Sequence, residues 1–226
     1  MLGIRVGFLT IGQSPRTDIM KDLRELLPRE VEVVEAGALD DYDEQCIKAD
    51  LAPAEGDTVY VTRLRTGVEV KISKNKIIPL LQKKIDHLNS LGVDLIVILC
   101  TGEFPEFSSS SPIIYPEKVL KGAASSLRLR GPVGILIPDQ AQVEYARNKW
   151  REFFSDVIVY PVSPYTSTIQ DFAKVASKLL SDRVSLVIMD CMGYTLEQRS
   201  IIQGIVRKPV IASRTILARI LTELLI

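Results

Sequence analysis

Short apolar runs without polar alternation are the feature that most constrains the fold of this chain. Runs rich in valine and isoleucine alternate with longer segments of helical periodicity. An unbroken apolar run is typical of a parallel strand that helices cover on both faces. We therefore predict an α/β fold whose strands are residues 4–10, 31–36, 94–100, 131–138, 156–161, 185–190 and 208–212.

One segment departs from this pattern. Residues 57–73 alternate apolar and polar side chains on either side of Arg65-Thr66-Gly67, which predicts a β-hairpin. Arg63 and Arg65 lie two positions apart and share a face, either as a solvated strand edge or as side chains that lean over a ligand. The acidic stretch 40–50 before the hairpin predicts an exposed loop and a short helix.

Three helices are predicted to begin just after a strand ends. Ser14 precedes a proline, and the segments Ser167-Thr168-Ile169-Gln170 and Thr195-Leu196-Glu197-Gln198 fit the capping box. The N-termini of these helices would point at the carboxyl edge of a sheet. Open α/β folds bind their ligands at that edge.

The sequence contains an internal repeat. "VDLIVILCTGEF" aligns with "VSLVIMDCMGYT" at an offset of 91 residues, and two other pairs match more loosely in the same order along the chain. The matching segments are 93–104 with 184–195, 5–14 with 132–141, and 111–127 with 208–224. We therefore expect two pseudo-symmetric parallel-sheet lobes with a cleft between them: residues 1–111 plus 212–226, and residues 112–211.

Each half of the repeat ends a predicted strand with Cys-x-Gly. Cys100 and Cys191 would face helix N-termini, where a thiolate is stabilised, and Gly102 and Gly193 would let the backbone turn and expose amides. Two such thiols could remove and supply a proton on opposite faces of one carbon. The alternative is inert packing, since free cysteine is often buried, and we assign Cys46 to that class.

Composition excludes several classes of function. The 28 basic and 28 acidic residues balance, so nucleic acid is not expected as a partner. No signal peptide and no membrane-spanning run is recognised, and three unpatterned cysteines suit a reducing compartment, so we expect a cytoplasmic protein. His87 has no cysteines near it for a metal site, and no nucleotide-binding loop is present, so no metal and no cofactor is expected.

Four segments together resemble the AroM family over essentially the whole chain. They are "TIGQSPRTDI" (10–19), "TRLRTGVEV" (62–70), "LCTGEFP" (99–105) and "DCMGYT" (190–195). More broadly the chain resembles the aspartate/glutamate racemase-like superfamily of cofactor-independent racemases, isomerases and decarboxylases. This resemblance implies catalytic roles for Cys100 and Cys191. The chain departs from the usual racemase loops. In those loops Asn-Thr usually follows the first cysteine and Thr often follows the second, whereas here Thr101-Gly102 and Met192-Gly193 follow.

The resemblance also implies ligand contacts around the two cysteines. In the superfamily the loop after the first strand contributes polar contacts, and Arg16, expected at the second helical position, is our preferred carboxylate clamp, with a solvated arginine as the alternative. Ser14 is either a helix cap or a ligand contact. The full set of predicted substrate-binding residues is Gly12, Gln13, Ser14, Arg16, Arg63, Thr101, Gly102, Met192, Gly193 and Tyr194.

Three hypotheses about function follow. The leading one is a cofactor-independent racemase, epimerase or isomerase that acts on a small carboxylate by two-cysteine proton transfer. The second is an isomerase or decarboxylase that uses one thiol, and the third is a protein that binds a small acid without chemistry. A homodimer is compatible with the sequence.

Overall fold

The computed structural model describes residues 3–28 and 31–225. The chain divides into two compact units, Met1–Glu117 with Ala218–Ile226, and Lys118–Leu217. Each unit contains one four-stranded parallel sheet. The predicted α/β class with two parallel sheets is therefore confirmed.

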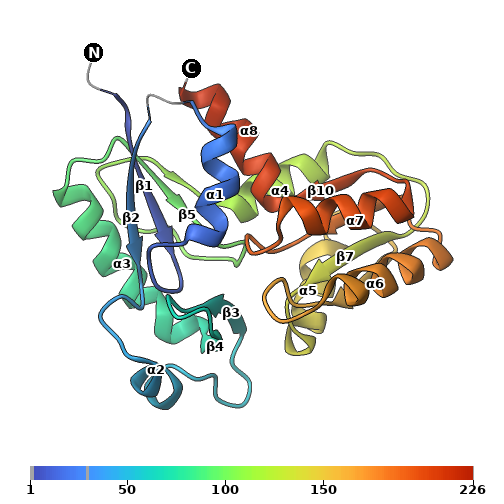
Figure 1. Cartoon of the computed structure of the whole chain (residues 1–226), viewed down its shortest axis with the longest axis horizontal. Coiled ribbons are helices and arrows are strands. Elements are labelled where there is room, and N and C mark those ends of the chain that lie inside the picture. The colour runs from blue at the N-terminus through green and yellow to red at the C-terminus, as the bar shows by residue number, and fades with distance from the viewer. Residues whose placement is uncertain (1–2, 29–30, 226) are drawn as a thin grey trace. The chain divides into compact units, whose positions relative to one another are not determined.

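The first unit has the strand order β2-β1-β5-β6. Its sheet strands are β1 (Arg5–Thr10), β2 (Glu32–Gly37), β5 (Leu95–Ile98) and β6 (Ile113–Ile114). Its helices are α1 (Thr17–Leu26), α2 (Glu44–Asp50) and α3 (Lys74–Ser90). The predicted hairpin is present as the antiparallel pair β3 (Val59–Arg63) and β4 (Glu69–Ser73) (Figure 1).

The second unit has the strand order β10-β9-β7-β8. Its strands are β7 (Val133–Ile137), β8 (Val157–Pro161), β9 (Leu186–Met189) and β10 (Val210–Ala212). Its helical elements are η1 (Gln140–Gln142), α5 (Val143–Arg151), α6 (Ile169–Ser181) and α7 (Leu196–Val206). Two further helices cross the boundary between the units in sequence, α4 (Pro116–Ser125) and α8 (Ser213–Leu225).

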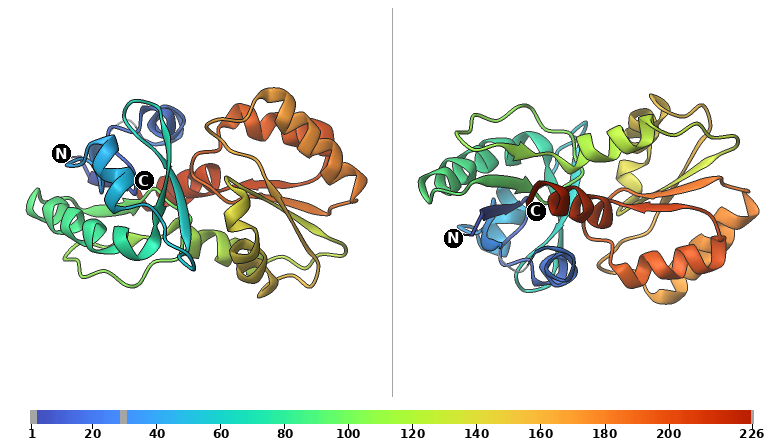
Figure 2. Two further views of the ribbon diagram at one scale, coloured as in Figure 1. Left: turned by 90° about the horizontal axis from the view of Figure 1, so that it is seen from below. Right: turned by 90° about the horizontal axis from the view of Figure 1, so that it is seen from above.

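Strand β9 shows why the apolar runs are unbroken. Val187 and Met189 pack in a core with α6 and α7, whereas Leu186 and Ile188 pack in a second core with α4 and α5. Helices α6 and α7, orange and orange-red, run side by side in both views of Figure 2. Because helices cover both faces of this sheet, every position of the strand requires an apolar side chain.

The internal repeat is visible as repeated topology. In each unit the first strand of the sheet pairs with the next strand on one side and, on the other, with the strand that precedes the cysteine loop, and a short fourth strand closes that edge. The packing repeats as well. A Cβ at Gly7 would touch Leu88 and Val93, and a Cβ at Gly134 would touch Leu179 and Val184, which are the residues 91 positions after Leu88 and Val93. The two halves are thus built on one plan.

Several predicted local features are wrong. Helix α1 begins at Thr17 with Arg16 at its N-cap, and the Ser14 hydroxyl donates to Asp40 instead of capping the helix. The α6 capping box is formed one residue later than predicted, by Thr168 and Asp171. The α7 box, Thr195 with Gln198, is confirmed.

The first cysteine has no helix directly after it. Residues 101–112 form an irregular segment between β5 and β6, and the next helix, α4, begins only at Pro116. A helix N-terminus facing the Cys100 thiol therefore stays a prediction. Cys191 is followed by α7, which begins five residues later at Leu196. Strand β6, only two residues long, was not among the predicted strands.

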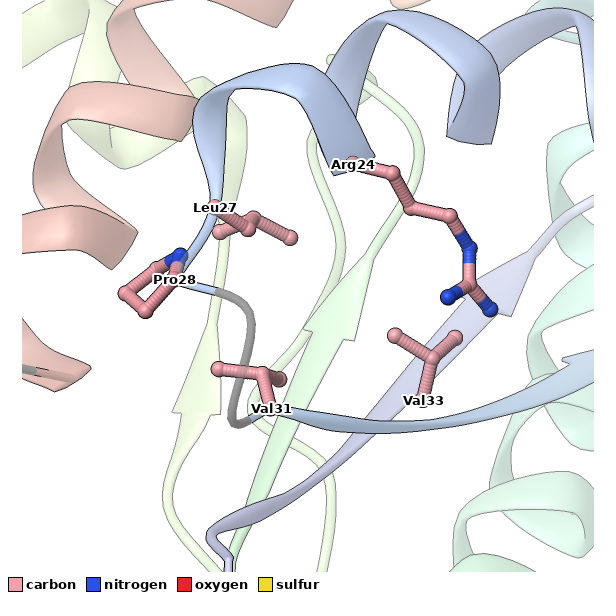
Figure 3. A pocket seen from close by; sticks show the side chains of 5 residues that line it. All are labelled: Arg24, Leu27, Pro28, Val31 and Val33. Carbon is pink, nitrogen blue, oxygen red and sulfur yellow. The ribbon is translucent and has the colours of Figure 1, made fainter.

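A shallow pocket lies between the end of α1 and the start of β2. Its lining residues are Arg24, Leu27, Pro28, Val31 and Val33, and the Arg24 side chain extends toward Val33 (Figure 3). Because β2 begins here and all four strands of the sheet are parallel, this pocket adjoins the amino edge of the sheet. The edge that carries Cys100 is the opposite one. Among the described helices, none combines the length and the apolar character needed to cross a membrane.

Candidate active site

The loop after β5 carries the first candidate thiol. Cys100 is partly buried and packs against the core of the first unit. Its Sγ accepts a hydrogen bond from the backbone N–H of Gly102 at 3.3 Å. Thr101, between them, is buried with 7% of its surface exposed. The backbone therefore turns back on the sulfur directly after the strand.

The loop after β9 repeats this geometry in the second unit. Cys191 is buried, and its Sγ accepts a hydrogen bond from the N–H of Gly193, also at 3.3 Å. An amide that points at sulfur favours the thiolate over the thiol, because a charged acceptor makes the stronger hydrogen bond. The sequence repeat therefore corresponds to one local structure that is built twice.

Each Cys-x-Gly loop needs its glycine because a tyrosine side chain lies against that position. A Cβ on Gly102 would lie 2.4 Å from Cζ of Tyr60, and a Cβ on Gly193 would lie 2.5 Å from the Tyr165 hydroxyl. Neither position has room for a larger residue unless the aromatic ring moves. The glycines thus allow a tyrosine to close over each cysteine loop.

We expect Gly102→Ala to destabilise the first unit and to displace its cysteine loop. The added methyl group would overlap the Tyr60 ring, and overpacking of this kind costs about 1–3 kcal/mol. Urea unfolding followed by circular dichroism measures the loss. The double variant Gly102→Ala with Tyr60→Leu should recover part of it, since the smaller side chain vacates the overlap. Equal stability of Gly102→Ala and wild type would contradict this packing.

The loop after β1 is held by its own neighbours. The Gln13 side chain donates to the carbonyl oxygens of Leu39 (3.2 Å) and Tyr42 (2.8 Å) and accepts from the amide of Arg65 (2.9 Å). A residue with this many partners fixes the loop against the hairpin and the β2–α2 connection. Gln13 therefore has a structural role in fixing this loop, and its predicted contact to a ligand stays a prediction.

Asp40, in the β2–α2 connection, holds the same loop from outside. Its carboxylate accepts from the amides of Gly37 and Ser14, each at 2.7 Å, from the Ser14 hydroxyl at 2.7 Å, and from Arg65 at 3.2 Å. Gly12 lies close by, where a Cβ would be 2.6 Å from the carbonyl oxygen of Arg63. The protein's own carboxylate thus binds the amide and the hydroxyl of Ser14, one of the predicted substrate-binding residues.

Arg16 is neither solvated nor at the second helical position. It is 3% exposed and sits at the N-cap, and its guanidinium donates to both oxygens of Asp18, at 2.9 and 2.8 Å, and to Thr10 at 3.1 Å. A ligand carboxylate would compete with Asp18 for this group. Arg63 donates to the Gly67 carbonyl within its own hairpin.

The second loop has fixed neighbours too. Met192 is 2% exposed, and Tyr194 is 1% exposed with its hydroxyl donating to the carbonyl of Val162 at 2.8 Å. The Tyr194 ring also makes an edge contact with Phe172. Tyr194 is thus part of the core of the second unit, and these contacts favour structural support over ligand contact for this residue.

Two buried cations next to Cys191 were not predicted from the sequence. Lys149 donates to both oxygens of Asp190, at 3.1 and 2.9 Å, and Trp150 donates to the same carboxylate at 2.7 Å. Arg214 donates to the carbonyl oxygens of Met192 and Gly193. The one available signal was "MDC", where an acidic residue ends an apolar strand just before the cysteine.

Among the described residues, no group of three or more histidine, cysteine, aspartate or glutamate side chains is placed to hold a metal ion. The amides of Gly102 and Gly193 donate to the two sulfurs, and beside the Cys191 loop lie two buried cations, Arg214 and Lys149, the second paired with Asp190. Such groups bind and orient anions and stabilise thiolates.

The comparison with protein families decides the assignment. The family described as AroM protein matches residues 6–225, which is nearly the whole chain. The chain belongs to the AroM family. No curated protein matches it significantly by sequence.

Solved structures place this AroM chain in the racemase-like fold. Allantoin racemase from Klebsiella pneumoniae aligns with a TM-score of 0.66 at 14% identity, covering 98% of this chain and 87% of that one. Glutamate racemase from Francisella tularensis, in complex with D-glutamate, gives 0.62 at 16% identity, covering 100% and 82%. Arylmalonate decarboxylase gives 0.58 at 10% identity, covering 98% and 92%. At these identities the likeness shows the fold alone.

Proposed function

We propose that this AroM-family chain is a cofactor-independent enzyme that acts on a small carboxylate, with Cys100 and Cys191 moving protons to and from one carbon. The observation that carries the proposal is the twice-built loop, in which each sulfur accepts the amide of the glycine two residues later at 3.3 Å. Two groups of matched chemistry suit a reaction that is its own mirror image, such as racemisation or epimerisation.

The proposed reaction consists of two proton transfers. One thiolate removes the hydrogen from the carbon next to the carboxylate, and the opposite thiol donates its proton to the other face. Charge balances, because one sulfur gains a proton as the other loses one. The glutamate racemase, whose structure holds D-glutamate, supports a carboxylic acid as the substrate class.

Hydrogen exchange in D2O tests the proposal across several classes of substrate at once. Purified protein is incubated with a panel of 2-amino, 2-hydroxy and 2-aryl carboxylic acids and with hydantoins, and deuterium at the α-carbon is read by NMR. We expect incorporation with at least one compound, and none with the Cys100→Ser/Cys191→Ser double variant. Cys46→Ser is the matched control, since Cys46 is exposed on α2 and outside the repeat.

A single-thiol reaction is the second candidate. The two loops differ in charge. Asp190, which is paired with the buried Lys149, directly precedes Cys191, whereas the apolar Leu99 precedes Cys100. In a decarboxylation, the bond from the α-carbon to one carboxylate breaks, CO2 leaves and one thiol supplies the proton. Release of CO2 from a 2-substituted malonate that depends on Cys191 and not on Cys100 would favour this candidate.

A third outcome is binding without chemistry. If compounds of the panel raise the melting temperature of wild type and of the double cysteine variant equally, and no exchange or CO2 release is found, the chain is a small-acid binding protein and the proposed enzyme is refuted.

A further inference from the structure

The second cysteine loop is held by a buried arginine that reaches its sulfur through one peptide group. Arg214, in the first turn of α8, is 1% exposed. Its Nε and Nη2 donate to the carbonyl oxygen of Met192 at 3.1 and 2.8 Å, and its Nη2 also donates to the carbonyl oxygen of Gly193 at 3.0 Å. The guanidinium thus binds two consecutive carbonyls of the loop.

Peptide geometry connects this arginine to Cys191. In a planar trans peptide the C=O and the N–H point in opposite directions. When Arg214 holds the Met192 carbonyl, the N–H of the same peptide, which belongs to Gly193, must point the other way. That N–H is the one that donates to the Cys191 sulfur at 3.3 Å. The arginine therefore fixes the direction of the amide that contacts the thiol.

The same peptide group also transmits charge. A cation that binds a carbonyl draws electron density toward the oxygen and makes the N–H on the other side a stronger donor, which is the cooperativity of hydrogen-bond chains. A stronger donor favours the thiolate as its acceptor. The first half of the repeat has no arginine at this position, because residue 117, aligned with Arg214, is a glutamate.

We propose that Arg214 is a positioning residue for Cys191, which orients and polarises the Met192–Gly193 peptide so that Cys191 is the more reactive thiolate of the pair. Cys191 would then be the resting base and Cys100 the resting acid. This assignment of roles rests on the proposed function, whereas the effect of Arg214 on the thiol does not.

Other titratable groups of the second unit adjoin this loop and bear on its charge. They are Asp190 before the cysteine, Lys149 of α5, Tyr194 within the loop, and Tyr165 of the segment between β8 and α6. Asp190 and Lys149 form an ion pair with no net charge. Of Arg214 and these four groups, Arg214 is accordingly the one that supplies net positive charge at neutral pH.

Thiol alkylation tests the inference without any substrate. In a Cys46→Ser/Cys100→Ser background, Cys191 is the one remaining thiol of the chain's three. Its rate of reaction with iodoacetamide is measured against pH, and thiolate absorbance in the ultraviolet gives an independent midpoint. We expect Arg214→Met to slow alkylation at neutral pH about tenfold and to move the midpoint of the profile upward by about one pH unit.

Two further variants separate positioning from packing. Arg214→Lys retains the charge and should recover much of the rate, whereas Arg214→Gln keeps a neutral donor and should leave the midpoint raised. Arg199→Met is the matched control: Arg199, on α7, also donates to a main-chain carbonyl, that of Val210 at 3.3 Å, outside the cysteine loop. Its profile should equal that of the background.

Three results would overturn the inference. They are an unmoved midpoint in folded Arg214→Met, a shift of equal size in Arg199→Met, or, if Arg214→Met fails to fold, an unmoved midpoint in Arg214→Gln. A raised midpoint combined with no exchange on any acid would refute the proposed function and leave the role of Arg214 standing. If the midpoint is unmoved and the protein does exchange an α-hydrogen, the role of Arg214 is refuted and the proposed function stands.

Discussion

Serine at either Cys100 or Cys191 should lower turnover by about 10²–10⁴-fold, the range that general acid–base groups contribute. A serine hydroxyl is a much weaker acid than a thiol, so it neither holds a negative charge at neutral pH nor supplies a proton at a comparable rate. Inversion of configuration needs both groups, so each single variant should show this loss. Chiral chromatography of the product measures it, with a substrate identified by the exchange screen.

The two single variants should differ in one further respect. Each keeps the thiol that removes the hydrogen from one enantiomer, so Cys100→Ser should still exchange one enantiomer with solvent, and Cys191→Ser the other. Cys46→Ser should retain wild-type turnover and exchange. If one of the two serine variants behaves like wild type, the two-thiol mechanism is excluded and the single-thiol candidate takes its place.

The substitution Asp190→Asn should lower the free energy of unfolding of the second unit by about 3–5 kcal/mol. The exposed side-chain fractions of Lys149 and Asp190 are only 2% and 5%, so removing the carboxylate charge leaves the ammonium buried without a counter-charge. Asparagine retains an oxygen that can accept from Trp150 Nε1. The effect is thus assigned to the lost charge.

The double variant Lys149→Met/Asp190→Asn completes a thermodynamic cycle. With neither charge present, most of the lost stability should return. Trp150 is the one tryptophan in the sequence, so its fluorescence during urea unfolding reports on this unit. Lys174→Met is the matched control, since its pair with Asp171 is exposed and should contribute about 0–1 kcal/mol. If the separate losses of Lys149→Met and Asp190→Asn simply add in the double variant, the two charges are not coupled.

Much of the fold could be predicted because its signals are local. Apolar runs indicated seven of the eight strands of the two parallel sheets, the alternation around Gly67 indicated the hairpin, and the order of the repeat indicated two units of equal plan. Strand β6 escaped because two residues are too few to show a period. The α6 cap was misplaced because Ser167 and Thr168 are adjacent residues with hydroxyl groups, and the hydrogen bonds between Thr168 and Asp171 decide which of the two caps the helix.

The surroundings of the candidate site were less predictable because they depend on long-range contacts. Gln13 is fixed by partners 26 to 52 positions away, and Arg214 holds carbonyls 21 and 22 positions away. No spacing rule connects such residues. Even the nearby pair of Arg16 and Asp18 was missed, because the expected helix start placed Arg16 inside the first turn instead of before it.

The division of the chain has a consequence for its synthesis. The second unit is one continuous segment, Lys118–Leu217, whereas the first is completed by residues after it: Leu221 is fully buried, and the Thr222 hydroxyl donates to the carbonyl of Leu26 at 3.0 Å. Domains usually fold in the order in which the ribosome makes them. The first unit therefore cannot complete its folding until the end of α8 has been synthesised. The second unit emerges later but can complete its folding earlier.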